Sequence, residues 1–386
     1  MYTQTVIDRI LSLESDVRHK SVFLFGPRQT GKTTFLRATF PGSPFYSLLQ
    51  ADVFLRFSAN PAALRQELAA QPTGTPVIID EIQKLPALLD EIHYMIEEEG
   101  RTFVMSGSSP IKLRRGGYNL LGGRARVKRL YPFVSAELPD WSLERVARFG
   151  TLPPIYQSSE PIQDLRDYAG TYLQMEVQAE GLVRGIQPFA RFLTIAAITS
   201  GEQVNFERAA SDAAVPARTV REYYRLLDET LLGEMLPVFR MSCAKRKPTA
   251  HGKFYFFDVG VANVLAGRTE VNPGSDAFGR CLEGLVFSEL RAWSHYFGSD
   301  RELSFWRTAD GTEVDFVVAD EMAIEVKATA RAHSRDLQGL RRIGDERRFR
   351  YRILACREEA PRLVDDILVL SIPEFLRRLW AGELLS

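Results

Sequence analysis

The sequence contains few cysteines and no long hydrophobic run. Three of its 386 residues are cysteine, at positions 243, 281 and 356, and no two of them have the spacing of paired metal ligands. This usage excludes a disulfide framework and favours a reducing compartment. No apolar run approaches the roughly 18 residues that a membrane span requires. Asp8, Glu14 and Asp16 interrupt any secretory pattern at the N-terminus. We therefore expect a cytoplasmic protein that does not enter a membrane.

The sequence also lacks an excess of charge of either sign. Its 49 basic and 49 acidic residues cancel, which argues against a wholesale polybasic nucleic-acid binder. Basic residues are nevertheless clustered: residues 112–129 contain seven and residues 240–253 contain five, with no acid in either, and residues 341–352 contain six arginines beside two acids. Such clusters either neutralise DNA phosphates or form solvated faces and subunit contacts. With 45% apolar residues, a chain of this length is expected to form two or three domains.

A short apolar segment at residues 22–25 leads directly into a glycine-rich loop with the spacing of a Walker A motif. Gly26 is followed after four residues by Gly31, Lys32 and Thr33, and a helix-compatible stretch comes next. Glycines let backbone N–H groups turn toward phosphates, and the helix adds its positive N-terminal end. Lys32 would reach the β- and γ-phosphates of ATP, and Thr33 would offer a hydroxyl to Mg²⁺. The alternative is a strand-to-helix turn that binds nothing. The predicted ATP-binding residues of the loop are Gly26, Pro27, Arg28, Gln29, Thr30, Gly31, Lys32, Thr33 and Thr34.

A second apolar strand, at residues 77–79, ends in two acids as a Walker B motif does. Asp80 would join Thr33 in holding Mg²⁺, and Glu81 would orient and deprotonate the attacking water. A third strand, at residues 101–105, is followed by a run of serines, of which Ser106 is the first candidate for contact with the γ-phosphate. The alternative is a strand capped by two solvated acids. Together the three strands predict ATP hydrolysis at the carboxyl edge of a parallel sheet.

These strings resemble a family of prokaryotic AAA-type ATPases whose C-terminal half is a domain of unknown function. Gly-Pro-Arg-Gln-Thr-Gly-Lys-Thr-Thr at 26–34, Asp-Glu-Ile-Gln-Lys-Leu-Pro at 80–86 and Phe-Tyr-Phe-Phe-Asp-Val-Gly at 254–260 carry the resemblance. It implies an oligomerising ATPase, such as a ring, with a DNA-processing tail that contains a winged helix and a PD-(D/E)xK nuclease-like fold. It also implies that Arg124 reaches the nucleotide of a neighbouring subunit as an arginine finger. Arg114 and Arg115 are weaker candidates for that role.

The chain after the first domain is predicted to contain a linker and a winged helix-turn-helix. An amphipathic helix at 163–181 would act as a lid or linker. Helices at 189–200, 205–214 and 217–232 and strands at 235–239 and 253–257 would form the winged helix, with Val220, Tyr224 and Leu227 buried. Its exposed arginines would contact DNA, whereas the alternative is a winged helix used only for packing. The predicted domains are 1–140 (ATPase), 141–188 (linker), 189–270 (winged helix) and 271–386 (nuclease-like).

The C-terminal segment carries a second constellation of charged residues. Two strands at 313–318 and 323–327 place Asp315 ahead of a Glu325-x-Lys327 sequence, which resembles the PD-(D/E)xK nuclease core. Asp315, Glu325 and the helical acid Glu283, with Glu289 as a fallback, would hold Mg²⁺. Lys327 would stabilise developing negative charge, and it is one of only nine lysines in the chain. The alternatives are a surface ion-pair ladder and a nuclease fold that binds without cutting.

The predicted fold class is α/β throughout: a P-loop AAA-type domain with a parallel sheet between helices, a winged helix, and a restriction-endonuclease-like domain. Its predicted function is ATP hydrolysis coupled to DNA binding and processing, either Mg²⁺-dependent cleavage or remodelling of branched DNA. The alternative is an ATP-gated oligomeric sensor or regulator that binds DNA or protein with an inactive nuclease fold. ATP and Mg²⁺ are the predicted cofactors.

Overall fold

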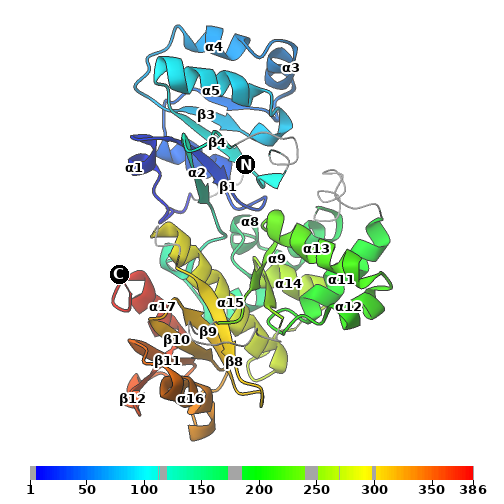
Figure 1. Ribbon diagram of the computed structural model, residues 1–386, viewed down its shortest axis with the longest axis vertical. Coiled ribbons are helices and arrows are strands. Elements are labelled where there is room, and N and C mark those ends of the chain that lie inside the picture. The colour runs from blue at the N-terminus through cyan, green and yellow to red at the C-terminus, as the bar shows by residue number, and fades with distance from the viewer. Residues whose placement is uncertain are drawn as a thin grey trace. The chain divides into compact units, whose positions relative to one another are not determined.

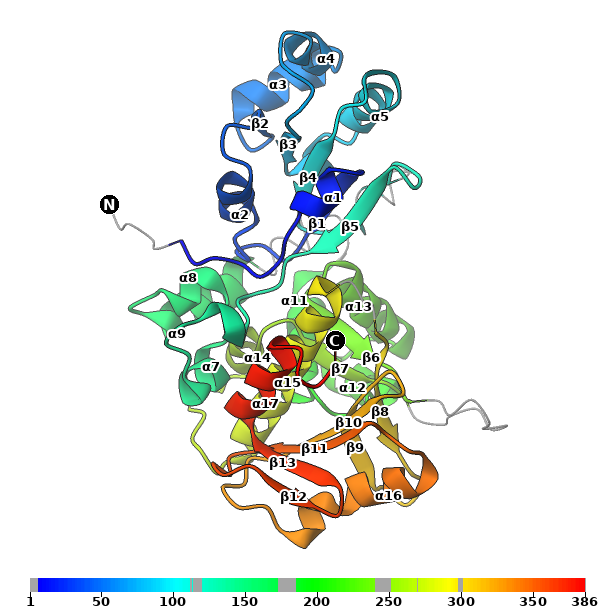
Figure 2. The same cartoon turned by 90° about the vertical axis from the view of Figure 1, so that its left-hand side faces the viewer.

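The computed structural model describes residues 6–111, 113, 120–172, 185–239, 251–268, 270–297 and 301–385. The chain forms two compact units, residues 1–132 with 229–231 and residues 133–228 with 232–386. Figures 1 and 2 show the elements of each unit from two sides. Among the described residues, none of the helices combines the length and the apolar character needed to cross a bilayer. The finer division of residues 133–386 into linker, winged helix and nuclease-like domain stays a prediction.

The N-terminal unit alternates strands with helices, as its sequence predicts. Predicted strands 77–79 and 101–105 correspond to β3 and β4, and β4 extends further so that Ser106 lies within it. The elements in chain order are α1 (Glu14–Val17), β1 (Ser21–Phe25), α2 (Lys32–Thr39), β2 (Phe45–Ser47), α3 (Ala51–Ala59), α4 (Ala63–Leu68), β3 (Val77–Asp80), the 3-10 turn η1 (Ile82–Lys84), α5 (Leu88–Glu99), β4 (Phe103–Gly107) and β5 (Ala125–Arg129).

The strands of this unit form a parallel sheet in the order β2-β3-β4-β1-β5. Because side chains alternate along a strand, Phe23 and Phe25 of β1 lie on one face, where they pack in one core with residues of α3, α4 and α5. Val22 and Leu24 are equally buried on the other face. Strands of a sheet that is buried on both faces have continuous apolar sequences, and residues 22–25 and 77–79 are continuous apolar segments of this kind. The predicted parallel sheet flanked by helices is confirmed.

The C-terminal unit begins with helices. The predicted helix at 163–181 corresponds to α9 and a following π-helical turn, and residues 173–184 lie outside the described chain. The predicted third helix, 217–232, ends three residues early, because Leu231 adopts a left-handed conformation with φ of 62°. The elements are η2 (Ser135–Glu137), α7 (Leu143–Phe149), α8 (Pro153–Tyr156), α9 (Pro161–Asp167), η3 (Tyr168–Tyr172), α11 (Ile186–Ile198), α12 (Phe206–Ala213), α13 (Ala217–Glu229), β6 (Gly233–Leu236), β7 (Lys253–Phe256) and α14 (Val259–Leu265).

Helices α11, α12 and α13 share an aromatic core with β7. Tyr224 of α13 is buried and contacts Phe192 of α11 and Phe254 of β7 edge to face. Val220 and Leu227 are also buried, which confirms the predicted stripe. Strands β6 and β7 pair antiparallel, and β6 ends before Pro237, whose ring cannot donate to a ladder. The basic residues predicted between these strands, 240–250, lie outside the described part of the chain.

The remainder of the unit is built on a six-stranded sheet in the order β12-β13-β11-β10-β9-β8. β8, β9 and β10 pair antiparallel, whereas β10, β11 and β13 run parallel. Figure 2 shows α16 on one face of this sheet and α15 and α17 on the other. The elements are α15 (Asp276–Tyr296), β8 (Leu303–Arg307), β9 (Glu313–Val318), β10 (Met322–Val326), η4 (Ser334–Leu337), α16 (Gln338–Glu346), β11 (Tyr351–Cys356), β12 (Arg362–Val364), β13 (Ile367–Ser371) and α17 (Ile372–Trp380).

The Asp258-Val-Gly260 sequence joins α14 to the loop after α7. The Asp258 carboxylate accepts hydrogen bonds from Val261 N, which caps α14, and from Thr151 N at 2.8 Å. Gly260 packs directly on the neighbouring backbone, because a Cβ at this position would lie 2.1 Å from the carbonyl oxygen of Phe149. This part of the sequence resemblance therefore has a structural explanation: an acid and a glycine allow two segments to approach closely.

We predict opposite effects on stability for two glycine-to-alanine substitutions in helices of this unit. Gly260→Ala should lower the free energy of unfolding by about 2 kcal/mol, because its Cβ meets backbone that cannot move aside. Gly279→Ala in α15 should raise it by about 0.5 kcal/mol, because the nearest atom to its Cβ is 3.9 Å away and alanine favours the helix. All four tryptophans lie in the C-terminal unit, so denaturation followed by tryptophan fluorescence measures both. Equal effects of the two substitutions would contradict this account of Gly260.

Glu289 joins three elements of the C-terminal unit. It is 1% exposed in α15 and accepts hydrogen bonds from Ser135 N at 2.7 Å, from Ser135 Oγ at 3.1 Å and from the Trp380 indole at 2.6 Å. These contacts connect η2 and α17 to the long helix. Burial raises the pKa of Glu289 to about 7, against the hydrogen bonds from Trp380 and Ser135, which lower it.

We predict that Glu289 makes the stability of this unit depend on pH. Between pH 4.5 and 7 the folded chain keeps a proton on Glu289 that the unfolded chain has released, so stability falls as pH rises through this range. The loss should reach about 3 kcal/mol. Glu289→Gln removes the titrating group, so its stability deficit relative to wild type should be larger at pH 5 than at pH 7.5. Denaturant titrations followed by tryptophan fluorescence at both pH values measure this difference, and a deficit independent of pH would contradict the prediction.

Candidate functional site

The Walker A loop lies between β1 and α2 and takes its shape from residues at its two ends. A Cβ on Gly26 would lie 2.3 Å from the carbonyl oxygen of Leu130, so only glycine fits there. Gln29 and Gly31 adopt left-handed conformations with φ of 63° and 86°, and Gly31 is the N-cap of α2. The backbone therefore curls around the N-terminus of an eight-residue helix, where N–H groups are free of intrahelical partners. This is the loop geometry that the sequence predicts.

Within the loop, the Lys32 ammonium bonds to the loop's own backbone. It donates to the carbonyl oxygens of Gly26 at 2.7 Å and Pro27 at 2.9 Å and is buried. Thr30 Oγ1 also donates to Pro27 O, at 2.8 Å. The guanidinium of Arg9 donates to Thr30 O at 2.9 Å and so fixes the loop from outside. These contacts hold the loop in one conformation around the ammonium of Lys32.

The Walker B strand places Asp80 beside the loop. Thr33 Oγ1 donates to Asp80 Oδ2 at 3.0 Å, and Ser106 Oγ donates to Asp80 Oδ1. Three residues that the sequence assigns to one site, from α2, β3 and β4, are thus brought together. A hydroxyl and a carboxylate oxygen side by side are hard ligands of the type that Mg²⁺ prefers, so Thr33 and Asp80 fit this ion.

Glu81 follows Asp80 in a left-handed conformation with φ of 64°. Its carboxylate accepts a hydrogen bond from Gln83 Nε2 at 2.5 Å, and the same amide lies 3.4 Å from Ser108 Oγ. Gln83 was not among the predicted site residues, although it stands in the Asp-Glu-Ile-Gln string that marks the family resemblance. Its role here is to orient the carboxylate of Glu81. A non-glycine residue in this region of φ and ψ is strained, and such strain concentrates at functional sites.

The predicted arginine finger, Arg124, is paired within its own unit. Its guanidinium donates to the Glu97 carboxylate of α5 and, at 3.4 Å, to Gly122 O, and the side chain is 40% exposed. An exposed pair of this kind is weak and can be exchanged for another partner. The weaker candidates Arg114 and Arg115 lie outside the described residues.

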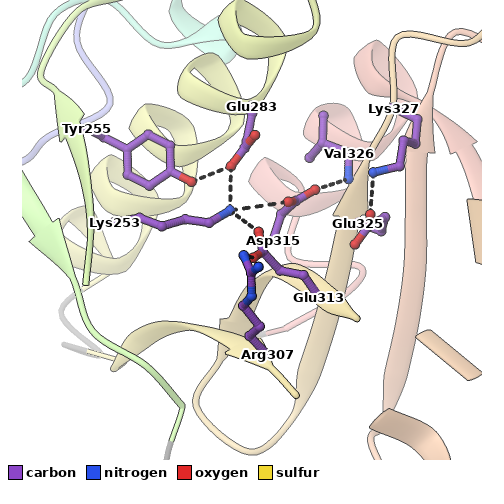
Figure 3. A network of polar contacts seen from close by, with 9 residues as sticks. All are labelled: Lys253, Tyr255, Glu283, Arg307, Glu313, Asp315, Glu325, Val326 and Lys327. Atoms are coloured by element: carbon purple, nitrogen blue, oxygen red, sulfur yellow. Dashed lines mark hydrogen bonds and ion pairs between the residues drawn. The ribbon is translucent and has the colours of Figure 1, made fainter. Parts of the chain in front are cut away.

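The C-terminal unit contains a second cluster of charged residues, which Figure 3 shows. Glu283 of α15 and Glu313 and Asp315 of β9 surround the ammonium of Lys253, at 3.0 Å, 2.5 Å and 3.5 Å. The pairing of Ile324 with Phe316 places Glu325 of β10 beside Asp315, and Lys327 bonds to Glu325. The predicted residues Glu283, Asp315, Glu325 and Lys327 are therefore close together. We call this group, with Lys253 and Glu313, the acidic cluster.

Most carboxylate oxygens of the acidic cluster have donors from the chain itself. Tyr255 donates to Glu283 at 2.5 Å, Arg307 to Glu313 at 2.9 Å, and the backbone N–H of Val326 to Asp315 at 2.9 Å. One oxygen of Glu325, Oε2, is buried with no hydrogen-bond partner. Burial, with a smaller contribution from Asp315, raises the pKa of Glu325 to about 8.

Lys253 is the cation at the centre of this cluster. Burial opposes its charge, but the carboxylates of Glu283, Asp315 and Glu313 outweigh that effect and hold its pKa well above the usual value. Its side chain is 4% exposed. Sequence reasoning missed Lys253 because it lies 30 or more residues from its partners, although lysine is scarce enough in this chain to have drawn attention. The fallback acid Glu289 is not part of the cluster, since it bonds to Ser135 and Trp380.

The predicted Mg²⁺ ligands of the acidic cluster do not fit a metal ion as they are arranged. In the part of the chain that the structure describes, no three carboxylate, imidazole or thiol side chains are grouped so as to hold one. Instead, an ammonium group lies between the carboxylates of Glu283, Glu313 and Asp315. The acidic cluster and the Walker site therefore differ: the first already contains a cation, and the second places the predicted metal ligands Thr33 and Asp80 beside the Walker A loop.

Three family models match consecutive parts of the chain. Residues 18–138 match a model described as an AAA domain. Residues 140–272 and 278–375 match two models described as domains of unknown function. The chain thus carries an AAA domain at its N-terminus followed by two further domains, and its resemblance to the AAA ATPases is confirmed in this respect. The winged-helix and nuclease-like character of the other two domains stays a prediction.

The chain matches two mycobacterial proteins and, much more weakly, one solved structure from an archaeon. An uncharacterized protein of Mycobacterium tuberculosis and one of Mycobacterium bovis are each 26% identical over 308 residues, which cover 77% of this chain and 67% of the relative. A crystal structure of a signal transduction ATPase with numerous domains and a tetratricopeptide repeat sensor, from Pyrococcus horikoshii, is 14% identical and covers 76% of this chain. The chain spans about half of that protein, 48%, and a TM-score of 0.25 is too low to indicate a shared fold.

Proposed function

We propose that the N-terminal unit binds and hydrolyses ATP. The observation that carries this proposal is the contact of Thr33 Oγ1 with Asp80 Oδ2 at 3.0 Å, beside a curled loop at the N-terminus of α2. The N–H groups of the loop would bind the phosphates, and Lys32 would exchange the carbonyls of Gly26 and Pro27 for phosphate oxygens. Mg²⁺, held by Thr33 and Asp80, would neutralise phosphate charge.

Glu81 would act as the base for the attacking water. Its carboxylate follows directly after Asp80 and is oriented by Gln83, so it needs little rearrangement before it accepts a proton. Ser106 holds the other oxygen of Asp80 and lies at the same sheet edge, where it would sense the γ-phosphate. Self-association would bring Arg124 of one subunit, released from Glu97, to the nucleotide of the next.

We predict that two substitutions separate binding from turnover. Lys32→Ala should abolish ATP binding, because it removes the cation that contacts the phosphates. Glu81→Gln should keep ATP bound and slow hydrolysis by about a hundredfold or more, because the amide cannot take up a proton. Binding of a fluorescent ATP analogue and phosphate release measure the two steps. The exposed Lys20, which bonds to Gly123 O, provides the matched control Lys20→Ala, which should leave both unchanged. Normal turnover by Lys32→Ala would refute the proposal.

We further propose that the C-terminal unit binds DNA without cutting it and that ATP controls this binding. Three helices followed by a two-stranded antiparallel sheet support a winged helix in this unit. Arg218, Arg221 and Arg225 lie on the exposed side of α13, opposite its buried stripe, where they would meet phosphates. The absence of cleavage is favoured by Lys253, which lies where the predicted metal ligands converge. We also propose that the protein resides in the cytoplasm. The described cysteines, Cys281 and Cys356, are free thiols, which agrees with a reducing compartment.

Cleavage remains the second candidate. It is supported by the order of the strands, in which an antiparallel β8-β9-β10 meander continues into parallel β11 and carries Asp315 and Glu325 on adjacent strands. If DNA were cut, cleavage would require Mg²⁺ and would disappear in Asp315→Ala while ATP hydrolysis persisted. Incubation of wild type and Asp315→Ala with linear and branched DNA in Mg²⁺ separates the candidates.

We predict that α13 carries the DNA contacts. Arg218→Ala/Arg221→Ala should weaken binding and reduce the slope of log affinity against log salt by about 2, one unit for each lost phosphate contact. The matched control is Arg377→Ala/Arg378→Ala on α17, which removes the same charge from another helix of this unit. Anisotropy of labelled DNA across a salt series, with and without an ATP analogue, measures both. Equal losses of DNA affinity in the two variants would show that α13 does not carry the DNA contacts. If the wild-type chain bound no DNA, DNA would be excluded as the ligand.

A further inference from the structure

The ammonium of Lys253 is enclosed by carboxylates from two elements. Glu283 Oε1 lies at 3.0 Å, Glu313 Oε1 at 2.5 Å and Asp315 Oδ1 at 3.5 Å (Figure 3). A lysine ammonium has three N–H donors and no acceptor. Here it donates a hydrogen bond to Glu283 and forms ion pairs with Glu313 and Asp315. The side chain is 4% exposed, which leaves its charge almost wholly to these partners.

We propose that Lys253 is the resident cation of the acidic cluster and excludes a divalent metal ion from it. The carboxylates converge on one point, and that point is occupied by a nitrogen of the chain itself. A metal ion could bind these oxygens only after the ammonium had left, because two positive centres cannot share the same oxygen ligands at this distance.

The backbone around Lys253 keeps it in this place. Lys253 is the first residue of β7, where it pairs with Leu236 of β6, and its ammonium lies 5.4 Å from the centre of the Phe305 ring of β8. The next residue inward on the same side of β7, Tyr255, donates to Glu283 and stacks on Phe287 of α15. Strand β7 is thus attached to α15 through both Lys253 and Tyr255. Withdrawal of the ammonium would have to break the contact between Lys253 and Glu283.

The charges of the cluster explain why a cation is required. Four carboxyl groups, those of Glu283, Glu313, Asp315 and Glu325, face three cations, Lys253, Lys327 and Arg307. Without Lys253, Glu283 and Asp315 would lose the cation that they contact, and buried carboxylates without a counter-charge are strongly unfavourable. A divalent ion supplied from solution would replace that counter-charge. The inference does not depend on ATP hydrolysis or on DNA binding, since it concerns only which cation the carboxylates hold.

The proposal is tested by measuring Mn²⁺ binding to the nucleotide-free full chain. All proteins compared carry Asp80→Asn, which removes the predicted metal ligand Asp80 from the Walker site, and the chain with this change alone is the parent. Free Mn²⁺ is followed by its electron paramagnetic resonance signal. Lys253→Met, which keeps the length of the side chain and removes its charge, should bind Mn²⁺ at least about tenfold more tightly than the parent. Addition of Asp315→Asn should remove the gain, and Lys253→Arg, which keeps the charge, should resemble the parent.

Two results would overturn the proposal. The first is Mn²⁺ binding by the parent chain that disappears in Asp315→Asn, since it would show a metal site open beside Lys253. The second is a folded Lys253→Met variant that gains no affinity. If Lys253→Met unfolds in the absence of metal, recovery of its tryptophan fluorescence on addition of Mn²⁺ supports the proposal. If Lys253→Met fails to fold with or without Mn²⁺, the test rests on Mn²⁺ binding by the parent chain. Binding that depends on Asp315 refutes the proposal, and no such binding supports it.

Discussion

A charged or polar side chain can be buried only where the chain provides partners for it, and this constraint shapes both units. Asp80 is held by hydroxyls from α2 and β4, Glu289 by donors from η2 and α17, and Asp258 by backbone N–H groups on both sides of a close approach. In the acidic cluster the partner is a full charge, that of Lys253. In each case one buried acid joins elements that are distant in sequence. Buried acids at the candidate sites and buried acids that hold the fold together therefore both need partners from the chain. They differ only in the groups around them.

The N-terminal unit could be predicted closely because its signals are local. The Walker A spacing specifies the loop, the strand before it and the helix after it, since few other residue types permit the left-handed conformation of Gly31 or the contact of Gly26 with Leu130. Residues 47 apart, Thr33 and Asp80, could also be expected to meet, because parallel strands bring their carboxyl ends to one edge of the sheet. The motif did not predict the contact of Gln83 with Glu81, because this contact depends on the turn η1 that follows β3.

The C-terminal unit was less predictable because its contacts depend on how separate elements pack. Strand alternation placed Glu313 with Asp315 and Glu325 with Lys327, and the structure brings these residues together. No periodicity in the sequence shows that Lys253, 62 residues before Asp315, enters the same cluster. Element ends also depended on single residues, such as the left-handed Leu231 after α13 and Pro237 after β6. Glu283, Asp315 and Glu325, predicted as metal ligands, lie close together, whereas the ammonium of Lys253 beside Glu283 and Asp315 was not predicted.

The left-handed backbone of Glu81 has a consequence for the history of such chains. An L-residue in this conformation is less stable than glycine by about 1 kcal/mol, so a carboxylate at this position costs stability that the proposed role of Glu81 as the base would have to justify. A descendant that had lost the need to hydrolyse nucleotide would gain stability from glycine or asparagine there without any other change in the loop. Under the proposed mechanism, the residue after Asp80 would then distinguish chains that hydrolyse ATP from chains that only bind it, even where the Walker A loop was intact.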